Sequence, residues 1–416
     1  MPTVQEKEGI RLKIGIYGGT FNPIHQGHMA AARAAVQQLD LDRLYLIPAG
    51  LPPHKAPPNG ASGLQRLDMA RLAAEALALD GRVEASDIEL NREGKSYTLD
   101  TLRLIRRQDP QARLYLLMGT DMFLSFQDWL HPEEIAGLCT LCAFCRSETD
   151  RPEVMEDQRA YLARHLGAET VLLRLPRVVD ISSTRLRELL SRGEGKAYLD
   201  PAVYGYILCQ GLYGVPADCR ALPLDDLRCA ALSMLDHRRI PHVLGTEETA
   251  ARLARRWGAD EEEARRGALL HDCTKKWGRE QQLALCRQYG IKPDKDELRQ
   301  TKLLHALTGA AVAADRFGVS AGVAQAIRWH TTGKADMNTL EKILYLADYI
   351  EPTRDFCDLT ELRRLAFADL DGAMLLGLTM AVEDLGKKGM PVHPNSVYAR
   401  DYLKGTETHE QTEGKA

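Results

Sequence analysis

The sequence predicts two domains of different fold class, an α/β domain built on a parallel sheet and, after it, an all-helical domain. Its 416 residues exceed the usual size of one domain. In the first half, short apolar runs of β-type composition alternate with longer stretches of helical period. Beyond about residue 214 the apolar residues recur almost everywhere at helical spacing, and no strand run of note follows.

The N-terminal domain is expected to span residues 11–214. Its predicted elements alternate in the order strand 11–17, helix 28–39, strand 43–48, helix 65–79, strand 83–88, helix 98–108 and strand 114–118. This alternation predicts a Rossmann-like fold, with parallel strands and helices on both faces of the sheet. Ligands bind such sheets beyond the carboxyl ends of the strands. Gly18-Gly19, PPHK (52–55) and GTD (119–121) follow predicted strands, so we expect them to meet at this edge.

Residues 215–225 are the expected linker, because the stretch VPADCRALPLDD contains two prolines and has no clear period. The helical domain should then occupy residues 226–404. Its predicted helices are 227–235, 246–257, 260–277, 280–289, 302–317, 321–330, 337–350 and 366–387. The last residues, 405–416, are polar, and we predict that they are disordered.

Composition excludes several classes of protein. The net charge of −4 gives no reason to expect a nucleic-acid partner. No run approaches the roughly 18 apolar residues of a membrane span, and the N-terminus has no apolar signal region. Nine scattered cysteines fit a reducing compartment better than a disulfide framework. We therefore expect a cytoplasmic protein with no membrane partner, whose oligomeric state the sequence leaves open.

Three cysteines lie close together at Cys139, Cys142 and Cys145. A zinc site would need a fourth ligand and usually a second pair, and no matching pair follows. The segment LCTLCAFC is apolar and is typical of a buried strand, where a free cysteine packs as a small hydrophobic residue. Core packing is therefore the favoured interpretation, with metal binding as the alternative.

The string GGTFNPIHQGHM, residues 18–29, is the first group of residues that indicates chemistry. Gly18-Gly19 after a strand allows a phosphate to approach the backbone, and the next helix offers its N-terminal N–H groups. His25 and His28 are compatible with phosphate contacts, with metal binding, or with a helix cap and a packed ring. The glycines alone do not decide among these interpretations.

The spacing of the whole string resembles the HxGH nucleotidyltransferases, with the motif at His25-Gln26-Gly27-His28. Four more strings follow in the order expected for the bacterial nicotinate-nucleotide adenylyltransferases. They are IPAGLPPHK (47–55), SYTLDTL (96–102), GTDMFLSFQDW (119–129) and DISSTRLR (180–187). The resemblance covers roughly residues 11–213.

That resemblance implies adenylyl transfer from ATP to nicotinate mononucleotide, giving nicotinate adenine dinucleotide and pyrophosphate. His25 and His28 would be the catalytic residues that hold the triphosphate, and Trp129 would stack on the pyridinium ring. Mg²⁺ would accompany ATP, without a dedicated protein cage. The choice between nicotinate and nicotinamide stays open. The other implied ATP- and substrate-binding residues are Gly18, Gly19, Thr20, Phe21, Gly27, Lys55, Thr98, Gly119, Asp121, Ser182, Ser183, Thr184 and Arg187.

The helical half contains a second group of polar residues in apolar surroundings. Asp272 in ALLHDCTKKW and Asp348 in ILYLADYIEP lie inside predicted helical runs, where a carboxylate is costly unless it is paired or metal-bound. The order His242, His271-Asp272, His305, His330, Asp348 resembles the HD-domain metal phosphohydrolases. The resemblance implies that these six residues bind one or two metal ions, with Asp272 also catalytic. Nitrogen and oxygen ligands favour Fe first, with Mn or Zn as alternatives, over Mg.

The flanking strings narrow this resemblance to the bacterial HD enzymes that split diadenosine tetraphosphate symmetrically into two ADP. They include IPHVLGTEETAARLA, IRWHTTGKADMNTLEKILYLADYIEPTRDF and LRRLAF, within residues 226–403. Lys275, Lys334 and Arg354 are candidates for additional phosphate contacts, whereas His237 lies outside the pattern. Two alternatives remain open: a phosphohydrolase of guanosine polyphosphates or mononucleotides, and a metal-bound nucleotide sensor without turnover.

Overall fold

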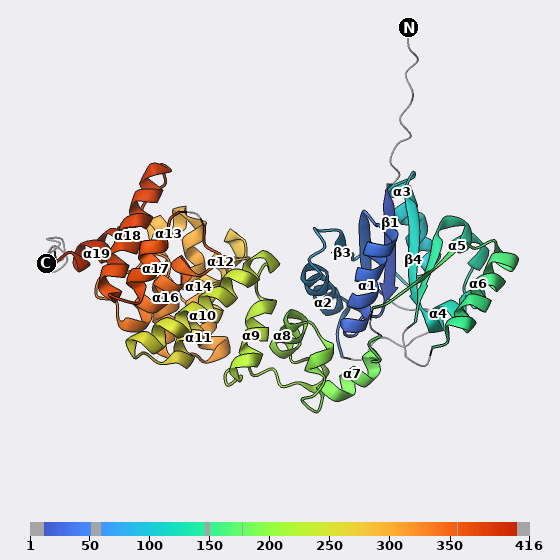
Figure 1. The fold of residues 1–416 in the computed structure, drawn as a ribbon, viewed down its shortest axis with the longest axis horizontal. Coiled ribbons are helices and arrows are strands. Elements are labelled where there is room, and N and C mark those ends of the chain that lie inside the picture. The colour runs from blue at the N-terminus through green and yellow to red at the C-terminus, as the bar shows by residue number, and fades with distance from the viewer. Residues whose placement is uncertain (1–11, 51–59, 146–149, 177, 356, 406–416) are drawn as a thin grey trace, which may run out of the picture. The chain divides into compact units, whose positions relative to one another are not determined.

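A computed structural model describes residues 12–50, 60–145, 150–176, 178–355 and 357–405. The chain divides into two compact units, with the division between Pro216 and Ala217 (Figure 1). We call them the N-terminal unit and the C-terminal unit and describe each by itself. The division falls inside the expected linker, but the linker is shorter than expected, because a helix of the C-terminal unit already begins at Leu224.

The N-terminal unit is built on a parallel sheet of six strands, as its alternating pattern predicts. The strands are β1 (Lys13–Gly19), β2 (Arg43–Pro48), β3 (Val83–Ala85), β4 (Arg113–Gly119), β5 (Thr140–Phe144) and β6 (Thr170–Leu173). Their order across the sheet is β3-β2-β1-β4-β5-β6, and every neighbouring pair is parallel. The strand order therefore reverses between β1 and β4, and the carboxyl ends beside such a reversal are where open parallel sheets bind ligands.

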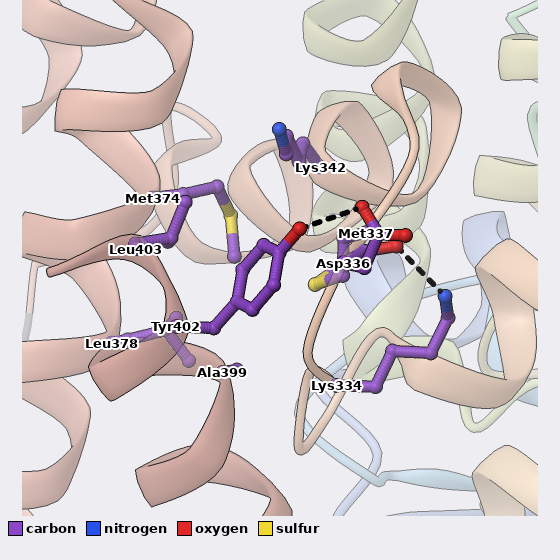
Figure 2. Close-up of a pocket in the computed structure, with 9 residues that line it drawn as sticks. All are labelled: Lys334, Asp336, Met337, Lys342, Met374, Leu378, Ala399, Tyr402 and Leu403. Carbon is purple, nitrogen blue, oxygen red and sulfur yellow. Dashed lines mark hydrogen bonds between the residues drawn. The ribbon is translucent and has the colours of Figure 1, made fainter. Parts of the chain in front are cut away.

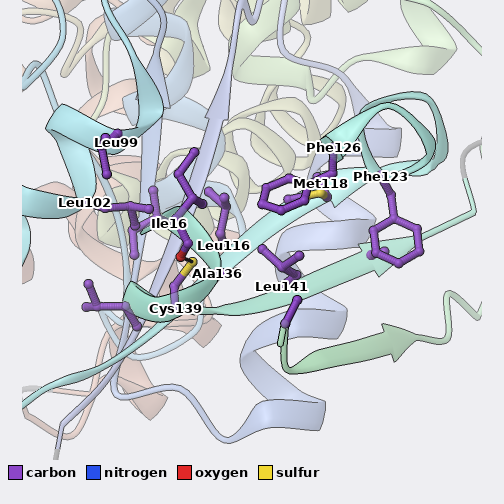
Figure 3. Packing of buried hydrophobic residues seen from close by; sticks show 14 of the residues in the cluster. Ile16, Leu99, Leu102, Leu116, Met118, Phe123, Phe126, Ala136, Cys139 and Leu141 are labelled. Carbon is purple, nitrogen blue, oxygen red and sulfur yellow. Dashed lines mark hydrogen bonds between the residues drawn. The ribbon is translucent and has the colours of Figure 1, made fainter. Parts of the chain in front are cut away.

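Helices connect the strands and cover both faces of the sheet, and two more helices follow β6 (Figure 1). They are α1 (Gln26–Leu39), α2 (Gly63–Ala76), α3 (Thr98–Gln108), α4 (Thr120–Leu124), α5 (Pro132–Leu138), α6 (Pro152–Leu166), α7 (Ser183–Leu190) and α8 (Pro201–Gln210). Alternate residues of β1 and β4, such as Ile16 and Leu116, point to one face and pack against Leu102 of α3 and Phe126 (Figure 3). The pairing of β1 with β4 runs from Lys13 and Arg113 to Ile16 and Leu116, so the last three residues of each strand lie beyond it.

Several element boundaries differ from those expected. Gly18 and Gly19 are the last two residues of β1 rather than the start of the following turn, because they pair in register with Ile47 and Pro48. The strand expected at 83–88 ends at Ala85, where its pairing with β2 stops. Helix α1 begins at Gln26, two residues earlier than expected.

The C-terminal unit is helical throughout its described residues, in agreement with the expected class. Its helices are α9 (Leu224–Ser233), α10 (Ile240–Trp257), α11 (Glu261–Leu270), α12 (Arg279–Gln288), α13 (Lys295–Arg299), α14 (Thr301–Phe317), α15 (Ala321–Trp329), α16 (Thr339–Ile350), α17 (Thr360–Ala366), α18 (Leu370–Lys387) and α19 (Pro394–Leu403). Among the described residues, no helix is long and apolar enough to cross a membrane.

Three expectations for this unit need correction. The helix expected at 260–277 stops at Leu270, so Asp272 lies in the turn after α11 rather than within a helical run. The helix expected at 366–387 begins only at Leu370, where Asp369 caps α18, and the separate helix α17 ends at Ala366. Helix α10 starts at Ile240 instead of Thr246, and this places His242 in its first turn.

Two candidate functional sites

In the N-terminal unit, His25 and His28 lie at the start of α1, just beyond the carboxyl end of β1. His25 is the N-cap of α1 and is 3% exposed, and the two ring centroids are 3.8 Å apart. The backbone N–H of His25 donates to Nδ1 of His28 over 3.2 Å. Since Nδ1 of His28 is an acceptor, the neutral ring carries its proton on Nε2. His28 therefore has an N–H group, the kind that a phosphate oxygen accepts.

Gly27 keeps the space beside His25 open. A Cβ at this position would lie 3.1 Å from the His25 ring and 3.4 Å from the Val179 carbonyl oxygen. At Gly19 a Cβ would lie 2.9 Å from the ring of Phe21, which in turn packs edge-on against His28. At Gly18 a Cβ would meet none of the described atoms within 4 Å.

Helix α7 holds the segment between β1 and α1 from a position 160 residues further along the chain. The hydroxyl of Ser183 donates to the Pro23 carbonyl over 3.1 Å, and Nη1 of Arg187 donates to the Asn22 carbonyl over 2.7 Å. Arg187 also reaches Thr184 Oγ1 at 3.2 Å. The side chain of Ser182 accepts from Arg185 N as a helix N-cap. The structure thus brings DISSTRLR and GGTFNPIHQGHM together at one edge of the sheet.

Arg66 on α2 is a further support of this edge that sequence reasoning missed. Its side chain is buried, and it donates to the carbonyls of Thr20 and Ala49 over 2.7 Å each. Burial lowers the pKa of its guanidinium, which still carries its charge. The signal in the sequence was a charged residue on the buried face formed with Met69 and Ala73.

Among the residues expected on the acceptor side, Gly119 and Asp121 lie at the carboxyl end of β4. Gly119 ends β4 and is the N-cap of α4, whose second residue is the exposed Asp121. Thr98 is the first residue of α3. Trp129 is half-buried, with its ring 5.3 Å from that of Phe126. Lys55 lies outside the described residues.

The three neighbouring cysteines are placed in or beside β5. Cys139 and Cys142 are buried, and burial raises the pKa of the Cys139 thiol to about 12. Burial raises the pKa of Cys142 as well. Thiols that stay protonated are poor metal ligands, so this geometry fits core packing.

In the C-terminal unit, six polar side chains converge from five helices and the turn after one of them. His242 lies on α10, His271 and Asp272 at the end of α11, His305 on α14, His330 at the end of α15 and Asp348 on α16. His242 Nε2 is 3.0 Å from Asp348 Oδ1, and His305 Nε2 is 3.1 Å from both Asp272 Oδ1 and His330 Nε2. His271 Nε2 lies 3.4 Å from Asp272 Oδ2. We call these six residues the histidine–aspartate cluster.

The four histidines of this cluster are oriented by partners behind their rings. The Nδ1 atoms of His271, His305 and His330 each lie 2.6 Å from a main-chain carbonyl three residues earlier. Nδ1 of His242 lies 3.0 Å from Glu351 Oε1. Since carbonyls and carboxylates only accept, each Nδ1 is a donor, and in a neutral ring Nε2 presents a lone pair to the centre.

Electrostatics distinguish the members of the cluster. Burial would raise the pKa values of Asp272 and Asp348, but the facing histidines outweigh it and hold both well below their ordinary value. Burial, reinforced by His271 and His305, lowers the pKa of His330 well below its ordinary value. Burial also lowers the pKa of His305. For His271 the nearby carboxylates outweigh burial and raise the pKa. The cluster thus holds two carboxylates and at least two neutral imidazoles, a suitable donor set for a metal.

Three cationic side chains stand around the two carboxylates, each about 30% exposed. Arg239 pairs with Asp272 through Nη2, and Lys275 Nζ is 3.0 Å from Asp272 Oδ1. Arg354 Nη2 is 2.6 Å from Asp348 Oδ1. We call Arg239, Lys275 and Arg354 the cationic rim. Sequence reasoning selected Lys275 and Arg354 but missed Arg239, for which RRIPH offered no distinguishing signal.

Lys334 lies elsewhere. Its Nζ is 3.1 Å from Glu341 Oε2 and 3.1 Å from the Asp336 carbonyl, beside a small hollow that Tyr402 also lines (Figure 2). The hollow measures about 10 Å³, room for about one water molecule, so it is too small for a nucleotide. His237 lies in a short turn before α10 and is not a member of the cluster.

Comparison with known proteins separates the two halves in the same way. The cytidylyltransferase-like family matches residues 16–189, and the HD domain family matches residues 239–353. A protein of Gloeobacter violaceus named "Probable nicotinate-nucleotide adenylyltransferase" is 40% identical over 209 residues, which cover 49% of this chain and 98% of that protein. The chain belongs to the nicotinate-nucleotide adenylyltransferase family. Its C-terminal unit is a helical HD domain.

Two solved structures show similarity to one half each. The structure described as "predicted HD superfamily hydrolase involved in NAD metabolism" from Clostridium acetobutylicum is 37% identical, and the match covers 45% of this chain and 99% of that one with a TM-score of 0.43. The nicotinic acid mononucleotide adenylyltransferase of Plasmodium falciparum is 18% identical, and the match covers 50% and 99% with a TM-score of 0.42.

Proposed function

We propose that the N-terminal unit transfers the adenylyl group of ATP to nicotinate mononucleotide. A phosphate oxygen of the mononucleotide forms a bond to the α-phosphorus of ATP, and the bond to pyrophosphate breaks. The products are nicotinate adenine dinucleotide and pyrophosphate. Family membership supports this substrate pair, and the position of His25 and His28 beyond β1 is the observation that carries the proposal.

The chemistry needs alignment and charge stabilisation rather than a nucleophilic side chain, because both reactants are anions. The Nε2–H of His28 can donate to a triphosphate oxygen where negative charge develops. The N-terminus of α1 contributes N–H groups and a favourable dipole at the same place. Thr184 in the first turn of α7 contacts Arg187, which reaches the segment between β1 and α1, so we assign both to the distal phosphates. Mg²⁺ would enter with ATP.

An assay of product formation from ATP and either nicotinate mononucleotide or nicotinamide mononucleotide tests this proposal. We expect nicotinate adenine dinucleotide, and we expect His28→Ala to reduce the rate by about a hundredfold or more, the effect of losing one donor to developing charge. A rate unchanged by His28→Ala would contradict the assignment. A preference for nicotinamide mononucleotide would be consistent with adenylyl transfer but would contradict nicotinate mononucleotide as the acceptor.

We propose that the C-terminal unit is a metal-dependent hydrolase that splits diadenosine tetraphosphate into two ADP. An HD domain implies a divalent metal, and the histidine–aspartate cluster fits one. Donor atoms of His242, His271 and Asp348 lie within 4.8 Å of one another, as do those of His271, Asp272 and His330. Among the described atoms, Nε2 of His242, Nε2 of His271 and Oδ1 of Asp272 are buried and make no hydrogen bond of good geometry. Buried polar atoms that face one another in this way are suited to metal coordination.

When bound, the metal would supply positive charge for the phosphate oxygens and lower the pKa of a water molecule. The chain's own contribution is orientation and charge. Glu351 and the main-chain carbonyls hold the imidazoles, and the cationic rim provides three positive charges for a polyphosphate chain. A tetraphosphate has the dense negative charge that such a rim recognises.

A substrate panel with the Mn²⁺-loaded protein tests this second proposal. We expect diadenosine tetraphosphate to be hydrolysed with ADP as the only product. We also expect Arg239→Ala to raise KM more than it lowers kcat, since the residue binds substrate phosphate. ATP plus AMP as products would overturn the symmetric cleavage. If only guanosine polyphosphates or mononucleotides were hydrolysed, diadenosine tetraphosphate would not be the substrate. If no nucleotide of the panel were hydrolysed, the result would favour a nucleotide sensor.

A further inference from the structure

Glu351 is a buried carboxylate behind the histidine–aspartate cluster, and it contacts only one of the four histidines. It follows α16 directly and has no exposed surface. Its Oε1 lies 3.0 Å from Nδ1 of His242, on the side of the ring opposite Asp348. The sequence places Glu351 109 residues from His242, so only the fold reveals the contact.

His242 differs from the other three histidines in this respect. His271, His305 and His330 donate to main-chain carbonyls of their own helical turns, contacts that any helix can supply. His242 instead lies in the first turn of α10, and the partner of its Nδ1 is a side chain rather than a main-chain carbonyl. A carboxylate partner carries a full negative charge and strengthens the opposite nitrogen as a metal donor.

The carboxylate of Glu351 has further partners of its own, among them Arg354, whose Nε lies 3.8 Å from Oε1. Thr353 donates to it twice, from its backbone N–H to Oε2 over 2.7 Å and from its hydroxyl to Oε1 over 2.6 Å. Gly245 on α10 makes room for it, because a Cβ at this position would lie 2.6 Å from Oε2 and 3.4 Å from Pro352. Glycine is otherwise a poor choice in a helix interior.

We propose that Glu351 is a positioning residue that fixes His242 as a metal ligand, and that Gly245 is glycine in order to admit it. This inference rests on the proposed metal site, which it deepens. Glu351 does not touch the metal or the substrate. It holds the proton of His242 on Nδ1, so that the lone pair of Nε2 faces Asp348 and the centre of the cluster.

Binding of Mn²⁺ to the metal-free full chain, measured by titration calorimetry, tests the inference. We expect Glu351→Gln to weaken Mn²⁺ binding by about 10- to 100-fold, the usual loss for a partner behind a metal ligand. Glu247→Gln is the matched control: this glutamate of α10 is also buried in the same unit, pairs with Arg228 and is not a member of the cluster. The control should bind Mn²⁺ as the wild type does. Equal affinity of Glu351→Gln and wild type would overturn the inference while leaving the metal site intact, whereas a wild type that binds no Mn²⁺ would overturn both.

Gly245→Ala is a second test of the role of Glu351, because it displaces the carboxylate without replacing the Glu351 side chain. Alanine favours a helix over glycine, so a loss of Mn²⁺ affinity in this variant would come from displacement of the carboxylate rather than from the helix. In a Glu351→Ala background the same substitution should have no further effect on affinity, because nothing is left to displace. Additive losses in the double variant would contradict the assigned role of Gly245.

Discussion

At the scale of single residues, the two sites use histidine in opposite tautomers. Nδ1 of His28 accepts a backbone N–H, so its Nε2 carries the proton and can donate to phosphate. Nδ1 of His271 donates to a carbonyl, so its Nε2 presents a lone pair that suits a metal. The hydrogen bond to Nδ1 of each ring therefore distinguishes the proposed phosphate-binding histidine from the proposed metal-binding one.

Motifs could predict the members of both sites, but not the residues behind them. His25 and His28 lie within four positions of each other, and the spacing of their string carries the information locally. Glu351 and Arg66 act through contacts with residues 109 and 46 positions away, and no local pattern encodes such pairs. Asp272 was expected inside a helix because ALLHDCTKKW has helical composition, yet the helix ends at Leu270 and the chain turns there.

The pH dependence of stability in the metal-free protein tests the environment of His330. Burial and the neighbouring histidines lower its pKa well below the ordinary value of 6.5 in the folded protein. Its contribution to stability is therefore fully present above pH 6.5 and is lost as the pH falls below 6.5 toward the folded-state pKa. We expect the free energy of unfolding to fall by up to about 1.4 kcal/mol per pH unit from this group, a slope that His330→Asn should remove.

Hydrogen exchange of core amides in α14 reports the free energy of unfolding of the C-terminal unit, and we compare its pH dependence in wild type and in His330→Asn. The raised pKa of His271 acts in the opposite direction, with a contribution present below pH 6.5 and lost as the pH rises through its folded-state pKa. The comparison of wild type with His330→Asn separates the two. Parallel pH profiles for the two proteins would mean that His330 titrates normally.

At the scale of elements, the N-terminal site depends on how strand ends are joined. The N–H of Ala49 donates to the Gly19 carbonyl over 2.8 Å, which links the ends of β1 and β2. The guanidinium of Arg66 bridges the same two segments from α2. The strand alternation predicted the parallel sheet, whereas β6 and α19 were missed because TVLL is too short and the α19 segment too polar to stand out.

Arg66→Lys is therefore expected to lower kcat for adenylyl transfer by about tenfold or more while changing the KM for ATP much less. Lysine keeps the charge but cannot donate to two carbonyls in a planar fork. Arg66→Gln, which also removes the charge, should in addition raise the KM for ATP. Steady-state kinetics of both variants check this, and an Arg66→Lys enzyme with wild-type kcat would show that the bridge is unnecessary.

At the scale of the whole molecule, the chain combines two units with separate cores and separate groups of polar residues. The sequence predicted both fold classes, because the change from alternating strands and helices to continuous helical spacing is visible without a structure. Each site draws its residues from one side of the division at residues 216 and 217. We therefore expect two activities that single substitutions can separate.

The measurement that tests this most directly assays both reactions on the same preparations of wild type, His28→Ala and Asp272→Asn. We expect His28→Ala to lose adenylyl transfer and keep hydrolysis of diadenosine tetraphosphate to ADP, and Asp272→Asn to show the reverse pattern. Circular dichroism of all three proteins controls for folding. Loss of both activities in either folded variant would contradict the claim that the chain carries two independent active sites.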